Sequence, residues 1–247
     1  AAIALFGAAL AGVPYVPLNY RLADQDLGAL LERIAPAFII GDGARAARLS
    51  AGHVVKTRAD FVSAADTRGA AADDLPEPEE TIAVQLFTSG TTAAPKAAIL
   101  RHANLLSYIL GTVEFMSAEE DEAALVSVPP YHVAGIAALL SSIYAMRRIV
   151  LLSAFEPASW IELVQRERVT SAFIVPTMLS RIIERMDERT NLTSLRSLAY
   201  GGGRMPAELI DRALKLFPET GFTNGYGLTE TSSTIALLGP EEHREAH

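Results

Sequence analysis

Short apolar runs alternate with segments of helical periodicity along most of the chain. Between Leu22 and Ile34 the apolar residues recur at helical spacing behind Asp24, a candidate helix cap, and the apolar run 38–40 follows. We therefore expect a helix that leads into a strand. Downstream we expect strands at 82–87, 125–128, 149–152, 172–175 and 198–200, and helices that begin at Asn104, Val133, Pro176 and Pro206 or lie around Trp160. This alternation predicts an α/β fold with mostly parallel β-sheets flanked by helices.

Two longer apolar stretches resemble membrane or signal segments at first sight. Residues 1–18 have no basic leader and contain two glycines and two prolines, so we expect a core helix that leads into a strand. Residues 133–152 are interrupted by two serines and two arginines, which sit poorly in hydrocarbon. We expect a buried helix and strand there, and no transmembrane segment.

The stretch 66–80 suggests how the chain is divided. It collects acidic residues, glycine and two prolines with few large apolar residues, as an exposed connection does. We expect a first part of an N-terminal domain at 1–65, an exposed linker at 66–81 and an α/β subdomain at 82–247. The sequence begins without methionine inside an amphipathic segment and ends on the polar stretch 241–247. We expect both ends to be cuts.

Composition narrows the classes of function. The 247 residues include no cysteine, which excludes disulfides and thiolate metal sites and makes a reducing cytoplasm the default compartment. The net charge of −8 and the lack of a basic run argue against a nucleic-acid partner. Small-molecule chemistry remains, and a homodimer stays open.

The segment with the clearest chemistry is 86–96, LFTSGTTAAPK. An apolar strand ends in hydroxyl residues around Gly90, and Lys96 follows. Hydroxyl and backbone N–H groups donate to anionic oxygens, and lysine adds a positive charge, so this loop suits phosphate. The same residue types also form ordinary surface turns. Pro95 and Ala97 break the G-x-x-x-x-G-K-[ST] pattern, which weakens a kinase or GTPase interpretation.

A second segment, 224–230, reads NGYGLTE. A tyrosine face can stack on a purine, a threonine hydroxyl can donate to a phosphate, and a glutamate can hold Mg²⁺. The alternative is a strand end and a turn in which Thr229 only caps a helix.

Two further segments follow expected strands. YGGGRMP, at 200–206, contains three glycines that either form a flexible turn or let main chain approach a ligand. PPYHVAG, at 129–135, places His132 between a strand and a helix, where the histidine is either structural or a substrate contact.

Together these four segments resemble the adenylate-forming (AMP-binding) superfamily, and within it the fatty-acid and acyl-CoA synthetases. TSGTT with the following PK resembles the phosphate loop, with Ala93 and Ala97 where the family form has glycine. The segment 224–230 resembles the YGxTE motif. The resemblance extends from about Leu5 to Glu230 and implies the central part of the large N-terminal domain, without the C-terminal domain and its adenylation lysine.

The resemblance implies ATP-dependent activation of a carboxylic acid, followed by thioester formation with coenzyme A. Amino-acid-activating members usually carry an aspartate where this chain has Tyr131 and His132, which favours a fatty or aryl acid over an amino acid. From the resemblance to fatty-acid synthetases we expect a fatty acid. The alternatives are an aryl-acid ligase, a ligase that delivers its product to an acyl carrier protein, and a non-catalytic nucleotide-binding module. We expect the chain alone to bind nucleotide weakly and not to turn over substrate.

The resemblance also implies a set of site residues. Lys96, Thr229 and Glu230 would be catalytic, with Glu230 as the Mg²⁺ ligand, and His132 and Gly202 would contact the acid. The ATP contacts would be Thr88, Ser89, Gly90, Thr91, Thr92, Lys96, Gly201, Gly202, Gly203, Asn224, Tyr226, Gly227 and Thr229.

Overall fold

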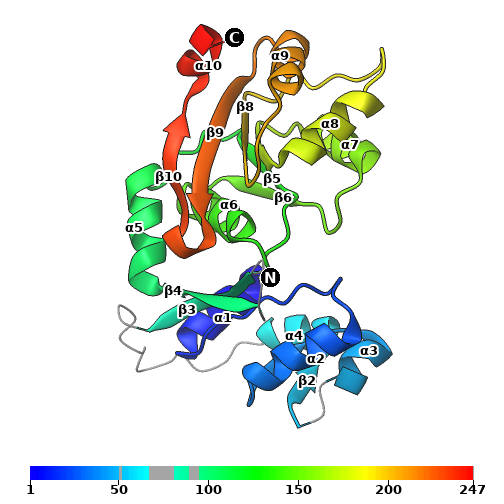
Figure 1. The fold of residues 1–247 in the computed structure, drawn as a ribbon, viewed down its shortest axis with the longest axis vertical. Helices are drawn as coiled ribbons and strands as arrows, with labels where there is room; N and C mark the ends of the chain where they lie inside the picture. Colours follow the sequence, from blue (N-terminus) through cyan, green and yellow to red (C-terminus); the bar gives the residue numbers. More distant parts are fainter. Residues whose placement is uncertain (50–51, 67–80, 89–94, 247) are drawn as a thin grey trace.

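A computed structural model describes residues 1–49, 52–66, 81–88 and 95–246 of the protein. Figure 1 shows a large body built on one twisted sheet, a β-hairpin beneath it, and a small lobe formed early in the chain. The expected linker therefore falls almost entirely on residues outside the described ones.

The main sheet has six strands in the order β10-β9-β8-β7-β5-β6. All neighbouring pairs are parallel except β9 and β10, which are antiparallel. This topology confirms the α/β fold with mostly parallel strands. The bounds are β5 Ala123–Val126, β6 Arg148–Leu151, β7 Ser171–Ile174, β8 Ser197–Gly201, β9 Gly221–Leu228 and β10 Ser233–Leu238.

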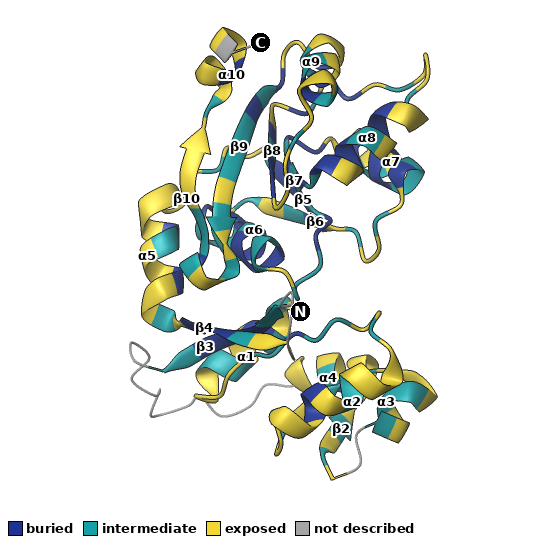
Figure 2. Cartoon of the chain, in the orientation of Figure 1, coloured by how far each residue is buried: buried dark blue, intermediate teal, exposed yellow. Residues whose placement is uncertain are grey.

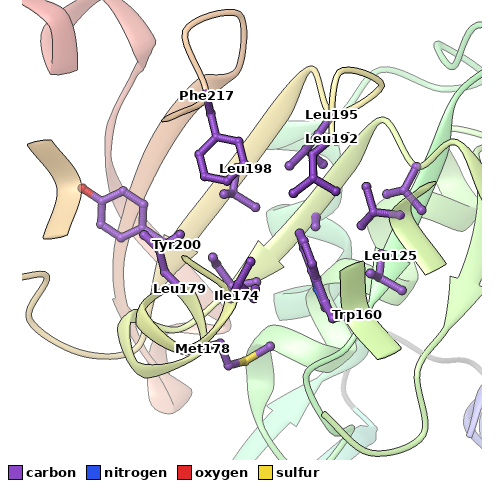
Figure 3. Close-up of a cluster of buried hydrophobic side chains, with 14 of the residues drawn as sticks. Leu125, Trp160, Ile174, Met178, Leu179, Leu192, Leu195, Leu198, Tyr200 and Phe217 are labelled. Atoms are coloured by element: carbon purple, nitrogen blue, oxygen red, sulfur yellow. The ribbon is translucent and has the colours of Figure 1, made fainter. Parts of the chain in front are cut away.

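Helices alternate with these strands along the chain, as parallel pairing requires. They are α6 Val133–Tyr144, α7 Pro157–Glu167, α8 Pro176–Arg185 and α9 Ala207–Leu216. The helices α7 and α8 pack together, and their apolar faces meet the sheet in a core around Trp160, Leu179 and Leu198, which are at most 1% exposed (Figure 3). The core holds the strands that carry most of the predicted site.

The hairpin consists of β3 Ile82–Thr88 and β4 Lys96–Arg101, paired antiparallel. It shares a second core with α1 Ala2–Leu10, α5 His102–Thr112 and α6. The prediction for residues 1–18 is right in part. The helix is present, but Leu5 is its only buried residue, and the expected strand is reduced to one bridge between Tyr15 and Val84.

The small lobe contains α2 Asp24–Arg33, β1 Phe38–Ile40, α3 Gly43–Leu49, β2 Val54–Lys56 and α4 Arg58–Ala65. Figure 2 shows mostly exposed and intermediate residues there. The predicted cap at Asp24 is wrong, because Ala23 occupies the cap position and Asp24 is the first helical residue. Asp24 instead pairs with Arg45 and Arg48, and hydrogen bonds from these two side chains lower its pKa.

Most predicted elements are present with small shifts at their ends. Helices begin at Val133 and Pro176 as predicted, whereas the helix expected from Asn104 begins two residues earlier and Pro206 caps α9 from outside. The pattern missed α3, β2, α4, β4 and β10, and the polar end of the chain forms the helix α10 Pro240–Ala246. Within the described residues, no helix combines the length and apolar character needed to cross a bilayer.

Candidate functional site

The ends of the hydroxyl-rich loop are the last residue pair of the hairpin. Thr88 ends β3, Lys96 begins β4, and the two lie opposite each other in the ladder. The Thr88 hydroxyl donates to the Lys96 carbonyl oxygen at 3.4 Å. The predicted contacts Ser89, Gly90, Thr91 and Thr92 lie outside the described residues. Because a strand follows the lysine, the local architecture differs from the strand–loop–helix of a P-loop.

Three other predicted segments meet at one edge of the main sheet. The strands β5, β7, β8 and β9 are parallel neighbours, so their carboxyl ends lie along the same edge. Residues 129–135 follow β5, Gly202 and Gly203 follow β8, and Thr229 and Glu230 follow β9. The carboxyl edge of an open α/β sheet is where such folds bind ligands.

The glycine turn at the end of β8 has two steric requirements. Gly201 lies opposite Gly225 of β9, and a Cβ on Gly201 would lie 2.4 Å from the Gly225 carbonyl oxygen. Gly202 has a φ of +73°, in the left-handed region that glycine adopts at little cost. The glycines therefore bring the turn close to the strand that carries Tyr226.

The end of β9 presents the predicted adenine contacts. Tyr226 is 62% exposed, so its ring is accessible for stacking, whereas Asn224 is partly buried. A Cβ on Gly227 would lie 1.6 Å from the carbonyl oxygen of Ser233 on β10. Only glycine lets the chain turn this tightly after Tyr226.

A 3₁₀ turn, Thr229–Thr231, connects β9 to β10. The alternative role of Thr229 as a helix cap is wrong, because Leu228 is the cap residue and Thr231 supplies the side-chain bond. The Thr231 hydroxyl accepts from the Leu228 N–H at 2.9 Å. Ser232 and Ser233 follow with φ of 59° and 103°, so the turn returns into β10 through left-handed backbone.

Glu230 lies at the surface of this turn. It lines an open hollow of about 390 Å³ between the turn and α5, together with Asn104, Ser107 and Tyr108. The strand β4, which begins at Lys96, also contacts the turn (Figure 1). The described residues therefore place the lysine strand and the glutamate turn side by side.

The donor set at Glu230 fits one kind of metal ion. Within the described ranges no cluster of three acidic, histidine or cysteine residues could enclose a metal. A single exposed carboxylate suits Mg²⁺, which commonly takes one or two protein carboxylates and completes its shell with phosphate oxygens and water.

His132 occupies the cap position before α6. Its ring centroid lies 4.7 Å from that of Tyr131, and Tyr131 packs edge-on against Tyr20 at 6.0 Å. Burial lowers the pKa of His132 and raises that of Tyr131, so both side chains are neutral near pH 7. A Cβ on Gly135 would lie 2.5 Å from the Pro129 carbonyl oxygen, so this glycine is required for the compact turn that positions His132.

Three residues that were not predicted from the sequence shape this edge. Gly201 packs closely against the backbone of Gly225. Thr231 holds the 3₁₀ turn through its hydrogen bond with Leu228, and Tyr200, at the start of the glycine turn, is hydrogen-bonded to His243. Gly225 and Thr231 lie within or next to the recognised motif, so their spacing could have drawn attention to them. The partner of Tyr200 is 43 residues away in the sequence, and no local pattern signals it.

The chain is similar in sequence to one family of enzymes and to CoA ligases within the known proteins. The profile of a family described as AMP-binding enzyme matches residues 1–247. A feruloyl-CoA synthase of Amycolatopsis is 34% identical over 239 residues, which cover 95% of this chain and 48% of that protein. A 2-succinylbenzoate–CoA ligase of Bacillus licheniformis is 29% identical, with 97% of this chain and 49% of the relative covered.

A solved structure shares this fold along nearly the whole chain. The O-succinylbenzoate coenzyme A synthetase of Bacillus subtilis, in complex with ATP and magnesium, superposes with a TM-score of 0.81 and 25% identity over 98% of this chain and 50% of that one. The chain thus spans about half the length of the curated relatives it matches.

Proposed function

We propose, on the premise that the chain belongs to the family of AMP-binding enzymes, that it forms the nucleotide-binding part of an acid–thiol ligase. The protein would activate a carboxylic acid with ATP and then transfer the acyl group to coenzyme A. The observation that carries this proposal is the convergence of His132, the glycine turn and Glu230 at one sheet edge, with the strand of Lys96 against the glutamate turn.

In the first step a carboxylate oxygen of the acid attacks the α-phosphorus of ATP. The bond from that phosphorus to the bridging oxygen breaks, and pyrophosphate leaves with the electron pair. In the second step a thiolate attacks the acyl carbon and AMP leaves. Charge builds up on phosphate oxygens in the first step, so preorganised donors and cations there accelerate it.

The residues of this chain divide that work. The Lys96 ammonium and the Thr229 hydroxyl would donate to phosphate oxygens, and Glu230 would hold Mg²⁺. A bound Mg²⁺ would neutralise phosphate charge. The exposed ring of Tyr226 would stack on adenine, while the glycine turn and Asn224 would line the nucleotide with main chain and an amide.

For the acid we propose a fatty chain rather than an amino acid, because the segment 129–135 has apolar residues around Tyr131 and His132 and no carboxylate that could pair with a substrate ammonium. One observation favours an aryl acid as second candidate. Tyr131 and His132 of this segment form a cluster of edge-on and tilted rings with Tyr20, and aromatic side chains pack well against an aromatic partner. Rates with octanoate, palmitate and a hydroxycinnamate, measured in one assay, separate the two.

The substitution Glu230→Gln tests the metal assignment in the complete protein that carries this chain. It keeps the size of the side chain and removes its charge. Loss of one preorganised interaction costs roughly 3 kcal/mol, so ATP–pyrophosphate exchange should fall about a hundredfold. Glu120→Gln is the matched control, because Glu120 is exposed and precedes β5 at the opposite edge of the sheet. Equal exchange rates in the two variants would exclude Glu230 as the metal ligand.

A further inference from the structure

Arg33, the last residue of α2, reaches out of the small lobe to the hairpin. Its guanidinium carbon lies 5.0 Å from the centroid of the Phe87 ring, and its Nη1 donates to the Pro95 carbonyl oxygen at 2.5 Å. Phe87 and Pro95 are eight residues apart in the sequence. The Arg33 side chain therefore contacts a residue near the end of β3 and the residue just before β4.

These two contacts adjoin the proposed phosphate-binding residues. Phe87 directly precedes Thr88, and Pro95 directly precedes Lys96. Phe87 pairs with Ala97 in the ladder, so the Arg33 contacts lie at the end of the hairpin where residues 89–95 connect the two strands and the last pair is Thr88 and Lys96. Fixing Phe87 and Pro95 restricts where the backbone of Thr88 and Lys96 can lie.

Arginine suits this double contact better than lysine. Its planar group stacks on an aromatic ring with its face and donates hydrogen bonds from its edge at the same time. A lysine ammonium is a point charge that can approach the ring or the carbonyl but has no such fork. Among the described residues the Arg33 side chain makes a hydrogen bond to Pro95 and a cation–π contact with Phe87, and both connect α2 to the hairpin.

We propose that Arg33 is a positioning residue for the nucleotide site. It sets the position of Lys96 and Thr88 relative to the small lobe and thereby tunes the affinity for the phosphates of MgATP. The proposal rests on the proposed function, because it assigns the hairpin end to ATP. Arg33 itself need not touch the nucleotide.

The test compares three substitutions in the complete protein that carries this chain. Arg33→Ala removes both contacts, Arg33→Lys keeps the charge, and Phe87→Leu removes only the ring. Arg166→Ala is the matched control, because Arg166 is an exposed arginine of α7 paired only with Glu162 and Glu167 among the described residues. Melting temperatures report whether each variant is folded.

The first measurement is steady-state ATP–pyrophosphate exchange. Displacement of a positioning contact should raise the KM for MgATP about tenfold in Arg33→Ala, with the KM for the acid unchanged and kcat within about twofold. Arg33→Lys and Phe87→Leu should fall between Arg33→Ala and the control. A purely structural attachment of the lobe would lower the melting temperature and leave the KM for MgATP at the control value, which would overturn the proposal.

The second measurement does not depend on activity. Hydrogen exchange at the amides of residues 96–98 should be faster in Arg33→Ala than in the control if Arg33 fixes the hairpin. Unchanged exchange would overturn the proposal even if the KM moved. A complete protein without any exchange activity would overturn the proposed function and the nucleotide half of this proposal, whereas the amide measurement would still decide the anchoring half.

Discussion

The phenolic oxygen of Tyr200 lies 2.8 Å from Nε2 of His243, and both groups are buried. Nδ1 of His243 lies 2.7 Å from the Gly239 carbonyl oxygen. A carbonyl only accepts, so Nδ1 carries the proton, Nε2 accepts, and the Tyr200 hydroxyl donates. This pair joins α10 to β8 one residue before the glycine turn. Burial also raises the pKa of Tyr200, which keeps the hydroxyl protonated.

The pair predicts a measurable coupling. His243→Phe leaves the buried Tyr200 hydroxyl without its acceptor and should lower the free energy of unfolding by about 2 kcal/mol. Tyr200→Phe should cost a similar amount, because His243 then lacks a donor. The double variant should cost less than the sum of the two, as measured by urea denaturation. Strictly additive losses would show that the two side chains do not interact in solution.

The tight turn after Tyr226 predicts a severe effect at Gly227. Gly227→Ala forces a Cβ against the Ser233 carbonyl oxygen, which must move together with its strand. We expect a loss of about 3 kcal/mol in the free energy of unfolding, at the upper end for overpacking. Gly28→Ala is the control, because a Cβ there meets no atom within 4 Å and the residue lies inside α2. That control should be neutral or stabilising.

The left-handed backbone after the 3₁₀ turn predicts a stabilising substitution. Ser233 has a φ of 103°, which strains any residue with a Cβ, whereas Ser232 at 59° lies in the tolerated left-handed well. Ser233→Gly should raise the free energy of unfolding by about 1 kcal/mol. Ser232→Gly should change it less. If chemical denaturation ranks the two variants in the opposite order, the backbone at Ser233 is not strained.

The raised pKa of the buried Tyr15 side chain predicts a loss of stability at alkaline pH. Burial raises its pKa to about 12, so the folded protein favours the neutral phenol. The unfolded chain releases this proton near pH 10, and stability therefore falls as the pH rises from about 10 towards 12, by roughly 3 kcal/mol at most. Tyr15→Phe should flatten this part of the curve. Curves of unfolding free energy against pH that run parallel in both proteins would contradict the assignment.

Periodicity predicted the parallel part of the fold because each strand there is a short buried run next to an amphipathic helix. The run at Leu198 and the helix that begins at Pro176 are examples, and both are found in the structure. The strand β4 was missed because only four apolar residues separate Lys96 from Arg101, too short a run to stand out as a strand. The positive φ angles of Ser232 and Ser233 before β10 could not be predicted, because serine has no preference for this backbone conformation.

The candidate site could be proposed from the sequence where its residues are contiguous. Thr229 and Glu230 were found as a motif, and the structure places them at the edge shared with the glycine turn and His132. Arg33 was not predictable, because a lone arginine at the end of a helix looks like any solvated charge. Its proposed role comes from its contacts with Phe87 and Pro95, which lie 54 and 62 positions later in the sequence.

The arrangement of the strands leaves a practical opening for experiments. All the proposed contacts along the main sheet follow the carboxyl ends of its strands, so the loop between α8 and β8, residues 186–196, lies at the other edge. Glu188 in that loop is exposed. The chain has no cysteine, so a cysteine introduced there would be its single labelling site. A fluorophore attached to it would follow nucleotide binding without contacting the proposed site residues.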